Sequence, residues 1–220
     1  MNFMVKGRPL VKEDRLNFNI YHGTSTRSLN SIRKHGFGYK DPELFDQNLL
    51  IKLAKEVEKH ADVSEFWKVN EYTINMMIDK TGRFTYDKMH FSPSRFTASN
   101  YARDNEGSEY LYTIHMLLEE LYKLDKGKAE EIITKCQKFK DYIKTAHQPI
   151  LVVWEKPLLS QLGTEGDLSL EGVERELDAM SITNSSSLTF EEVANTLWQQ
   201  SIFLSKEVLS YNEIKIEEIT

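Results

Sequence analysis

The sequence predicts an α+β fold in which many helices accompany a modest sheet. The clearest strand is PILVVWEKP, at residues 149–157, where five consecutive apolar residues stand between two prolines. Such an uninterrupted apolar run favours a strand that is buried on both faces and lies centrally in its sheet. Apolar residues at helical spacing dominate two longer ranges, 42–80 and 108–148. A buried strand among long helical patterns is typical of an α+β domain.

The composition is that of an ordinary globular protein. The chain has 220 residues, of which 40% are hydrophobic and 28% charged, and this suffices for one sizeable domain with an elaborated insertion. The net charge of −6 argues against a broad electrostatic grip on nucleic acid, although it allows a local basic groove.

The sequence pattern predicts neither a membrane span nor a secretory signal. The longest uncharged apolar runs, ILVVW and TIHMLL, are far shorter than the roughly 20 residues that span a bilayer. Residues 1–18 contain no apolar core of signal-peptide length, and Cys136 is the single cysteine, which excludes an internal disulfide framework. We therefore expect no membrane partner and a cytoplasmic location, in the producer or in a target cell.

The first element combines a short β-prone stretch with a hydroxyl-rich segment. Residues 18–21 alternate weakly, and His-Gly-Thr-Ser follows them. The next residues predict a short helix, with Ser25 or Ser28 as its N-cap and Gly36 at its end. The pattern predicts a strand, a tight loop and a helix in this order.

The middle of the chain predicts mostly helices. Range 42–80 predicts two helices with a break near 62–64. A strand stopped by Pro93 and a helix starting near Thr97 follow. Range 108–148 carries two helical patterns separated at 125–127, which we expect to form an antiparallel pair.

The last part of the chain mixes all three states. Residues 160–187 are rich in Gly, Ser and acidic residues, so we expect a mobile surface loop with one short helical stretch. A further helix is expected at 190–200, and residues 201–219 contain at least two β-prone pieces.

Three separated stretches carry the chemistry: YHGTS at 21–25, HFSPSRFTASNYA at 90–102 and KEVLS at 206–210. In this order they resemble the NAD-dependent ADP-ribosyltransferases of the diphtheria-toxin and poly(ADP-ribose) polymerase type. The match covers about a third of the chain. The resemblance implies one domain over 1–220 with a split β-core around an NAD cleft, and helical insertions at about 40–85 and 106–148.

The resemblance assigns the first stretch to NAD, which is a substrate in this family. His22 would hydrogen-bond the adenosine ribose, and the hydroxyls of Thr24 and Ser25 would contact ribose or phosphate. At Gly23 the lack of a side chain lets the backbone approach the nicotinamide carboxamide and offer its N–H and C=O.

The other two stretches would complete the site. Tyr101 corresponds to the aromatic residue that stacks on the nicotinamide. His90 stands where the family has its first tyrosine and is a candidate catalytic residue that would clamp the nicotinamide side with Tyr101. Glu207 is matched to the catalytic acid, which binds the ribose 2′-hydroxyl and stabilises developing positive charge. It precedes the apolar pair Val208-Leu209, unlike three nearby acids, Glu213, Glu217 and Glu218. Ser205 disfavours the arginine-modifying branch, which has a second glutamate at that position.

The implied function is transfer of one ADP-ribose from NAD to a macromolecular acceptor, either protein or nucleic acid. A bacterial or phage effector or toxin, held by an antitoxin or another inhibitor protein, would fit a compact enzyme of this kind.

Two alternatives stay open. RNA 2′-phosphotransferases also use NAD and have a histidine at the second strand. Their arginines grip phosphate, as Arg95 and Arg103 would do here, and Arg95 is a candidate cofactor contact in either case. Against that assignment, position 88 is Lys where those enzymes have His, and Glu207 is present where they lack an acid. The other alternative is an inactive module that binds NAD or ADP-ribose.

Metal and thiol chemistry find little support. Four histidines, His35, His60, His115 and His147, show no ligand spacing with one another or with Cys136, so we expect no metal site. Cys136 lies in a charged helical pattern without a partner motif, and we expect no nucleophilic role for it.

Overall fold

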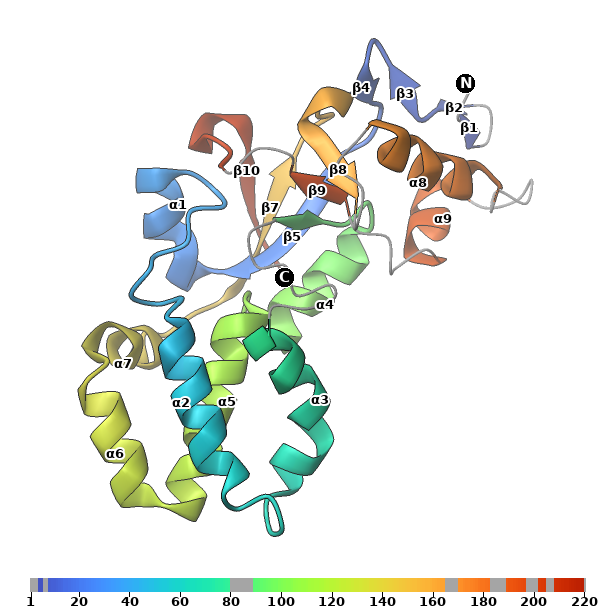
Figure 1. The fold of residues 1–220 in the computed structure, drawn as a ribbon. Helices are drawn as coiled ribbons and strands as arrows, with labels where there is room; N and C mark the ends of the chain where they lie inside the picture. The colour runs from blue at the N-terminus through green and yellow to red at the C-terminus, as the bar shows by residue number, and fades with distance from the viewer. Residues whose placement is uncertain are drawn as a thin grey trace. The chain divides into compact units, whose positions relative to one another are not determined.

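The computed structural model describes residues 4–5, 8–79, 89–164, 170–182, 189–196, 202–204 and 208–219. Its elements confirm a mixed α+β architecture that is mostly helical with small antiparallel sheets (Figure 1). The chain divides into two compact units. Unit 1 comprises 1–39, 87–107 and 148–220, and unit 2 comprises 40–86 and 108–147. The ranges expected as helical insertions thus coincide closely with unit 2.

The first sheet of unit 1 is centred on β7 (Pro149–Trp154), which pairs antiparallel with β5 (Ile20–Ser25) on one side and with β10 (Lys215–Glu218) on the other. Every residue of β7 after Pro149 is buried. The prediction of a central strand buried on both faces is confirmed, because apolar side chains cover both sides of the sheet.

The second sheet of unit 1 has the order β6 (His90–Phe91), β9 (Ile202–Leu204) and β8 (Leu162–Thr164), all antiparallel. Two small hairpins precede β5, namely β1 (Met4–Val5) with β2 (Arg8–Pro9), and β3 (Val11–Lys12) with β4 (Arg15–Leu16). The sequence pattern did not predict these hairpins. The two β-prone pieces expected in 201–219 are confirmed as β9 and β10.

The range 160–187 was expected as a mobile surface loop with one short helical stretch. The helical stretch is confirmed, whereas the surface loop is wrong for the described residues. They form the end of the 3-10 turn η2 (Leu159–Gln161), then β8 and the helix α8 (Leu170–Ile182). Helix α8 packs on β8 (Figure 1), and its side chains Val173 and Leu177 are buried in the core. A second helix, α9 (Phe190–Thr196), follows.

Strand β5 is longer than predicted. His-Gly-Thr-Ser does not form a tight loop, because each residue from His22 to Ser25 has a partner in β7. A 3-10 turn, η1 (Thr26–Ser28), and then α1 (Leu29–His35) follow directly. Ser28 is the N-cap of α1, and Gly36 ends the helix with φ of +89°, which glycine adopts without strain.

Helix α4 (Arg95–Asp104) covers one face of β5 and β7. It begins two residues before the expected start, because the Ser94 side chain caps it by accepting a hydrogen bond from the Thr97 N–H at 3.0 Å. Near the C-terminus a 3-10 turn, η3 (Tyr211–Glu213), leads into β10.

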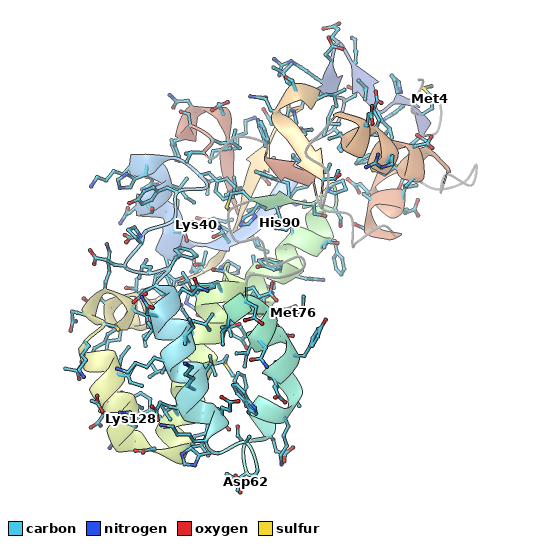
Figure 2. All side chains as sticks on the ribbon, in the orientation of Figure 1. Met4, Lys40, Asp62, Met76, His90 and Lys128 are labelled. Atoms are coloured by element: carbon cyan, nitrogen blue, oxygen red, sulfur yellow. The ribbon has the colours of Figure 1, made fainter. Side chains whose placement is uncertain are left out.

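Unit 2 is a helical cluster with its own apolar core. Helices α2 (Gln47–Glu58) and α3 (Glu65–Asp79) confirm the predicted break, and Asp62 lies at the turn between them (Figure 2). The second pattern is three helices and not two: α5 (Glu109–Leu124), α6 (Lys126–Thr134) and α7 (Gln137–Lys144). No helix in the described ranges is long and apolar enough to cross a membrane.

Candidate functional site

In the part of the chain that the structure describes, the two sheets of unit 1 are joined by one residue pair, Tyr21 of β5 with Ser92 directly after β6. Tyr21 and Ser92 exchange both backbone hydrogen bonds, each 2.8 Å long. In an antiparallel ladder the next hydrogen-bonded pair along these strands would join Gly23 and His90. That pair does not form. Instead, the ring nitrogen Nδ1 of His22 lies 2.6 Å from the His90 carbonyl oxygen, so the ladder is interrupted one step after it begins.

The interrupted ladder leaves a donor and an acceptor at Gly23. Backbone groups along a strand point alternately to its two edges, and Tyr21 directs its own toward Ser92, so those of Gly23 also point away from β7. Among the described residues, no hydrogen bond outside the β5–β7 ladder involves Gly23. Gly23 is itself buried, and buried backbone polar groups normally have partners. The N–H and C=O of Gly23 therefore form a pair of adjacent groups that a ligand would satisfy.

A packing requirement also explains why residue 23 is glycine. A Cβ there would lie 2.0 Å from the Ala98 carbonyl oxygen and 2.8 Å from the Ala102 nitrogen, both in the backbone of α4. The sequence resemblance explained Gly23 by the close approach of a ligand. The packing of α4 is sufficient to explain it without a ligand. The close approach that the structure contains is that of α4.

His22 is held as a neutral ring at physiological pH. Burial lowers the pKa of His22 to about 4, and the hydrogen bond with the His90 carbonyl offsets only part of this effect. A neutral imidazole that donates from Nδ1 keeps Nε2 as an acceptor. The ring packs edge-on against Phe37 and Phe91, with centroids 4.8 and 6.0 Å away. The Tyr101 ring of α4 lies 6.4 Å away.

His90 contributes its backbone to this cluster. It lies on β6 (Figure 2), and alternation along the strand places its side chain on the face opposite Phe91. Since Phe91 belongs to the core that contacts His22, the two imidazole rings do not meet. His90 therefore neighbours His22 through its backbone carbonyl.

Thr24 and Ser25 were expected to contact ribose or phosphate, and the structure buries both of them. Their exposed fractions are 3% and 0%. Thr24 Oγ1 donates to the Gly107 carbonyl at 3.3 Å, while Ser25 Oγ has no hydrogen-bond partner among the described residues. Gly107 covers this end of β5, because a Cβ on it would lie 2.4 Å from the Ser25 nitrogen. In this conformation neither hydroxyl is exposed to a ligand.

The predicted catalytic acid, Glu207, lies outside the described residues. Two of the acids considered beside it have structural contacts. The Glu213 carboxylate accepts a hydrogen bond from the Ser210 N–H at 2.9 Å in a capping box. The Glu217 carboxylate pairs with the guanidinium of Arg95. These contacts explain both acids without a catalytic role.

A cavity of about 530 Å³ lies on the α4 side of β5, and sequence reasoning did not find it. Its lining includes rings, amides and guanidinium groups, among them those of Asn19, Tyr21, Arg95, Phe96, Arg103 and Asn195. Arg95 and Arg103 therefore share one cavity, as proximity along one helix predicts. Arg95 lies beside Tyr21, with its guanidinium carbon 5.9 Å from the ring centroid.

Comparison with protein-family models, curated proteins and solved structures finds no match. Within the described ranges there is no cluster of three or more His, Cys, Asp or Glu side chains suited to a metal ion. The arrangement around Gly23 consists of a backbone donor and acceptor, a neutral imidazole acceptor and an aromatic ring. The hydrogen-bonding groups and the ring are chemically suited to a polar planar ligand.

Proposed function

We propose that the chain is an NAD-dependent mono-ADP-ribosyltransferase that binds the nicotinamide end of NAD at Gly23. The observation that carries this proposal is the ladder interrupted between Gly23 and His90. A carboxamide has the same donor and acceptor as the missing peptide partner. It would accept from the Gly23 N–H and donate to the Gly23 C=O.

The neighbouring side chains support the same ligand. The Nε2 atom of neutral His22 is an acceptor, suited to a ribose hydroxyl. The Tyr101 ring lies near His22 and would offer a π-face to the planar nicotinamide. Both contacts would hold and orient NAD. Neither contact requires the His22 ring to be protonated.

In the transfer step, the bond between the ribose C1 carbon and the nicotinamide nitrogen breaks, and nicotinamide leaves as a neutral molecule. A nucleophilic atom of the acceptor forms the new bond to C1 and loses its proton. Glu207 is the proposed acid that holds the ribose 2′-hydroxyl and stabilises the positive charge of the oxocarbenium-like state. The acceptor is a protein or a nucleic acid.

The carboxamide contact is tested by calorimetric titration with NAD and with its analogue that carries a carboxylate in place of the carboxamide. The analogue lacks the N–H for the Gly23 carbonyl and places a negative charge beside it, so we expect binding at least about ten-fold weaker. ADP-ribose, which lacks the nicotinamide, is the control. Equal affinity for NAD and the carboxylate analogue would contradict the proposed contact at Gly23.

Transfer is tested with labelled NAD and a cell lysate, treated in parallel with protease and with nucleases. The wild-type chain should produce a labelled macromolecule, and Glu207→Gln should abolish it. Glu218→Gln, a matched change at an exposed glutamate of β10, should leave the product unchanged. The treatment that removes the label identifies the acceptor class.

A second candidate function is RNA 2′-phosphotransfer, and the shared position of Arg95 and Arg103 in one cavity favours it. Two guanidinium groups there suit a phosphate. NAD-dependent conversion of a 2′-phosphorylated RNA end, unaffected by Glu207→Gln, would establish this activity. NAD binding without either product would leave the third candidate, an inactive binding module.

As an effector or toxin, the enzyme would act in the cytoplasm of the producer or of a target cell and have an inhibitor protein as a partner. Induced expression tests this part of the proposal. Wild type should arrest growth and Glu207→Gln should not, whereas equal growth of both strains would argue for a regulatory enzyme.

A further inference from the structure

We propose that the cavity beside Tyr21 binds one unstacked nucleotide of a single-stranded nucleic acid, which is the acceptor of the ADP-ribose. The proposal rests on the proposed function, because it assigns the second substrate of that same enzyme. The cavity of about 530 Å³ falls within the range of roughly 300–1,000 Å³ typical of small-molecule sites. A compact group inserted from a larger molecule fits such a volume.

The walls of the cavity suit a planar base. Tyr21 and Phe96 supply rings, and Phe96 is 63% exposed at the surface of α4. An exposed aromatic ring beside a cavity is a platform on which single-stranded bases stack. A base inside a duplex is not available for such stacking, so the expected substrate is single-stranded.

The polar atoms of the cavity suit the edge of a base. Asn19 and Asn195 both line it, and amide side chains pair with bases through a donor and an acceptor. The Asn195 Oδ1 atom already accepts from the Ser94 hydroxyl at 2.5 Å, which fixes the orientation of the amide and directs its NH₂ as a donor elsewhere. Burial raises the pKa of the Tyr21 phenol, so its hydroxyl stays protonated and can donate.

The charged groups suit the attached phosphate. Arg95 and Arg103 lie two turns apart on one face of α4. Arg95 uses one terminal nitrogen, Nη1, for its pair with Glu217, and a guanidinium has five N–H donors in a planar fork. Glu191 also lines the cavity, so the local charge is mixed. The site therefore favours one base with its phosphate over a long polyanion gripped by charge alone.

The position of the cavity fits an acceptor site. Tyr21 lines it, and the pair formed by Tyr21 and Ser92 is the point where the two sheets meet. The unpaired groups of Gly23 lie two residues further along the same strand. The donor substrate at Gly23 and an acceptor base in the cavity lined by Tyr21 would thus lie two residues apart along β5, which brings both reactants close together.

The binding test is fluorescence anisotropy with fluorescein-labelled single-stranded DNA and RNA oligonucleotides of mixed sequence. Phe96→Ala and Arg103→Gln should each weaken binding at least about five-fold. Tyr72→Ala and Arg33→Gln change an exposed aromatic residue and an exposed arginine that do not line the cavity, and they should alter binding less than about two-fold. A duplex of the same sequence should bind more weakly than either single strand.

Several outcomes would overturn the proposal. These are absence of oligonucleotide binding, equal losses in cavity and control variants, duplex binding as tight as single-strand binding, or a transfer product that protease removes. NAD titrations on the same samples separate the two levels of inference. NAD binding without oligonucleotide binding refutes the acceptor assignment alone, whereas failure to discriminate NAD from its carboxylate analogue refutes the donor site.

Discussion

Replacing Gly23 by alanine tests how closely α4 approaches β5. The added Cβ would lie 2.0 Å from the Ala98 carbonyl oxygen, whereas an ordinary contact begins at 3.4 Å. The gap must therefore widen by 3.4 minus 2.0, or 1.4 Å. The contacted atoms belong to the backbone of α4, so no side-chain rotation relieves the clash and the whole helix has to move.

The expected cost follows from this geometry. Overpacking of a well-packed core typically costs about 1–3 kcal/mol, and we expect the upper part of that range because backbone atoms clash. Such a loss is large beside a total stability of about 5–15 kcal/mol. With a urea dependence of about 2–3 kcal/mol per molar, it lowers the unfolding midpoint of unit 1 by about 1 M.

The assay is urea unfolding followed by far-ultraviolet circular dichroism, with Gly127→Ala as the matched control. A Cβ on Gly127 would meet only the Asp125 carboxylate at 3.6 Å, and Gly127 lies in helix α6, so the control should be neutral or stabilising by about 0.5–1 kcal/mol. If Gly23→Ala unfolds at the same urea concentration as the wild-type chain, the close approach of α4 is wrong.

Three further predictions concern single contacts. The pKa of His22 is lowered from 6.5 to about 4 in the folded chain, so the unfolded state binds a proton at a higher pH than the folded state does. About 3 kcal/mol of stability is therefore lost as the pH falls from 6.5 to about 4. Urea unfolding at several pH values should show this loss, and His22→Asn should reduce it. Arg27→Ala should lower the free energy of unfolding in urea by about 2–3 kcal/mol. The Arg27 side chain is only 5% exposed, and its Nη1 lies 2.5 Å from the Glu106 carboxylate, which the substitution leaves without this partner. Ser64→Ala should cost about 1–3 kcal/mol in thermal unfolding, because Ser64 Oγ donates to the buried Glu120 at 2.6 Å and accepts from the first turn of α3; an unchanged Tm would contradict this capping role.

Local patterns predicted the elements whose stability is local. The apolar run at 150–154 became the central strand, and the spacing of apolar residues predicted both α2 and α3. In these segments the periodicity of burial and the intrinsic preference agree. Helix α8 was expected only as a short helical stretch within a loop, because glycine, serine and acidic residues dominate its surroundings. The helical spacing of Val173, Leu177 and Met180 would have predicted that this helix packs into the core.

Pairing between distant segments overrode local preference in β5. Glycine and hydroxyl residues favour turns, so His-Gly-Thr-Ser predicts a loop when it is considered alone. Its four residues instead pair with β7, the strand that supplies buried apolar partners. Strand preference depends strongly on such neighbours, and the register between β5 and β7 is not contained in either segment.

Sequence patterns predicted that some residues of the candidate site lie together, but not which contacts they make. His22, Gly23 and Tyr101 do lie together, and His90 joins them through its carbonyl. The interrupted ladder depends on where β5 and β6 separate, which no single segment specifies. The cavity lined by Arg95 and Phe96 depends in turn on residues of α9, whose position follows from tertiary packing.

The two demands on residue 23 are coupled, and this determines how variants of the site should be interpreted. The same contact that excludes a side chain, between Gly23 and Ala98 of α4, also holds Tyr101 near His22. A larger residue at 23 would move α4 and thereby displace the Tyr101 ring, even though it leaves the N–H and C=O of residue 23 in place. Loss of the proposed NAD binding in Gly23→Ala would therefore follow from the displaced helix alone and would not test the carboxamide contact. Only a change in the ligand, from carboxamide to carboxylate on the unaltered protein, separates the contact from the packing that supports it.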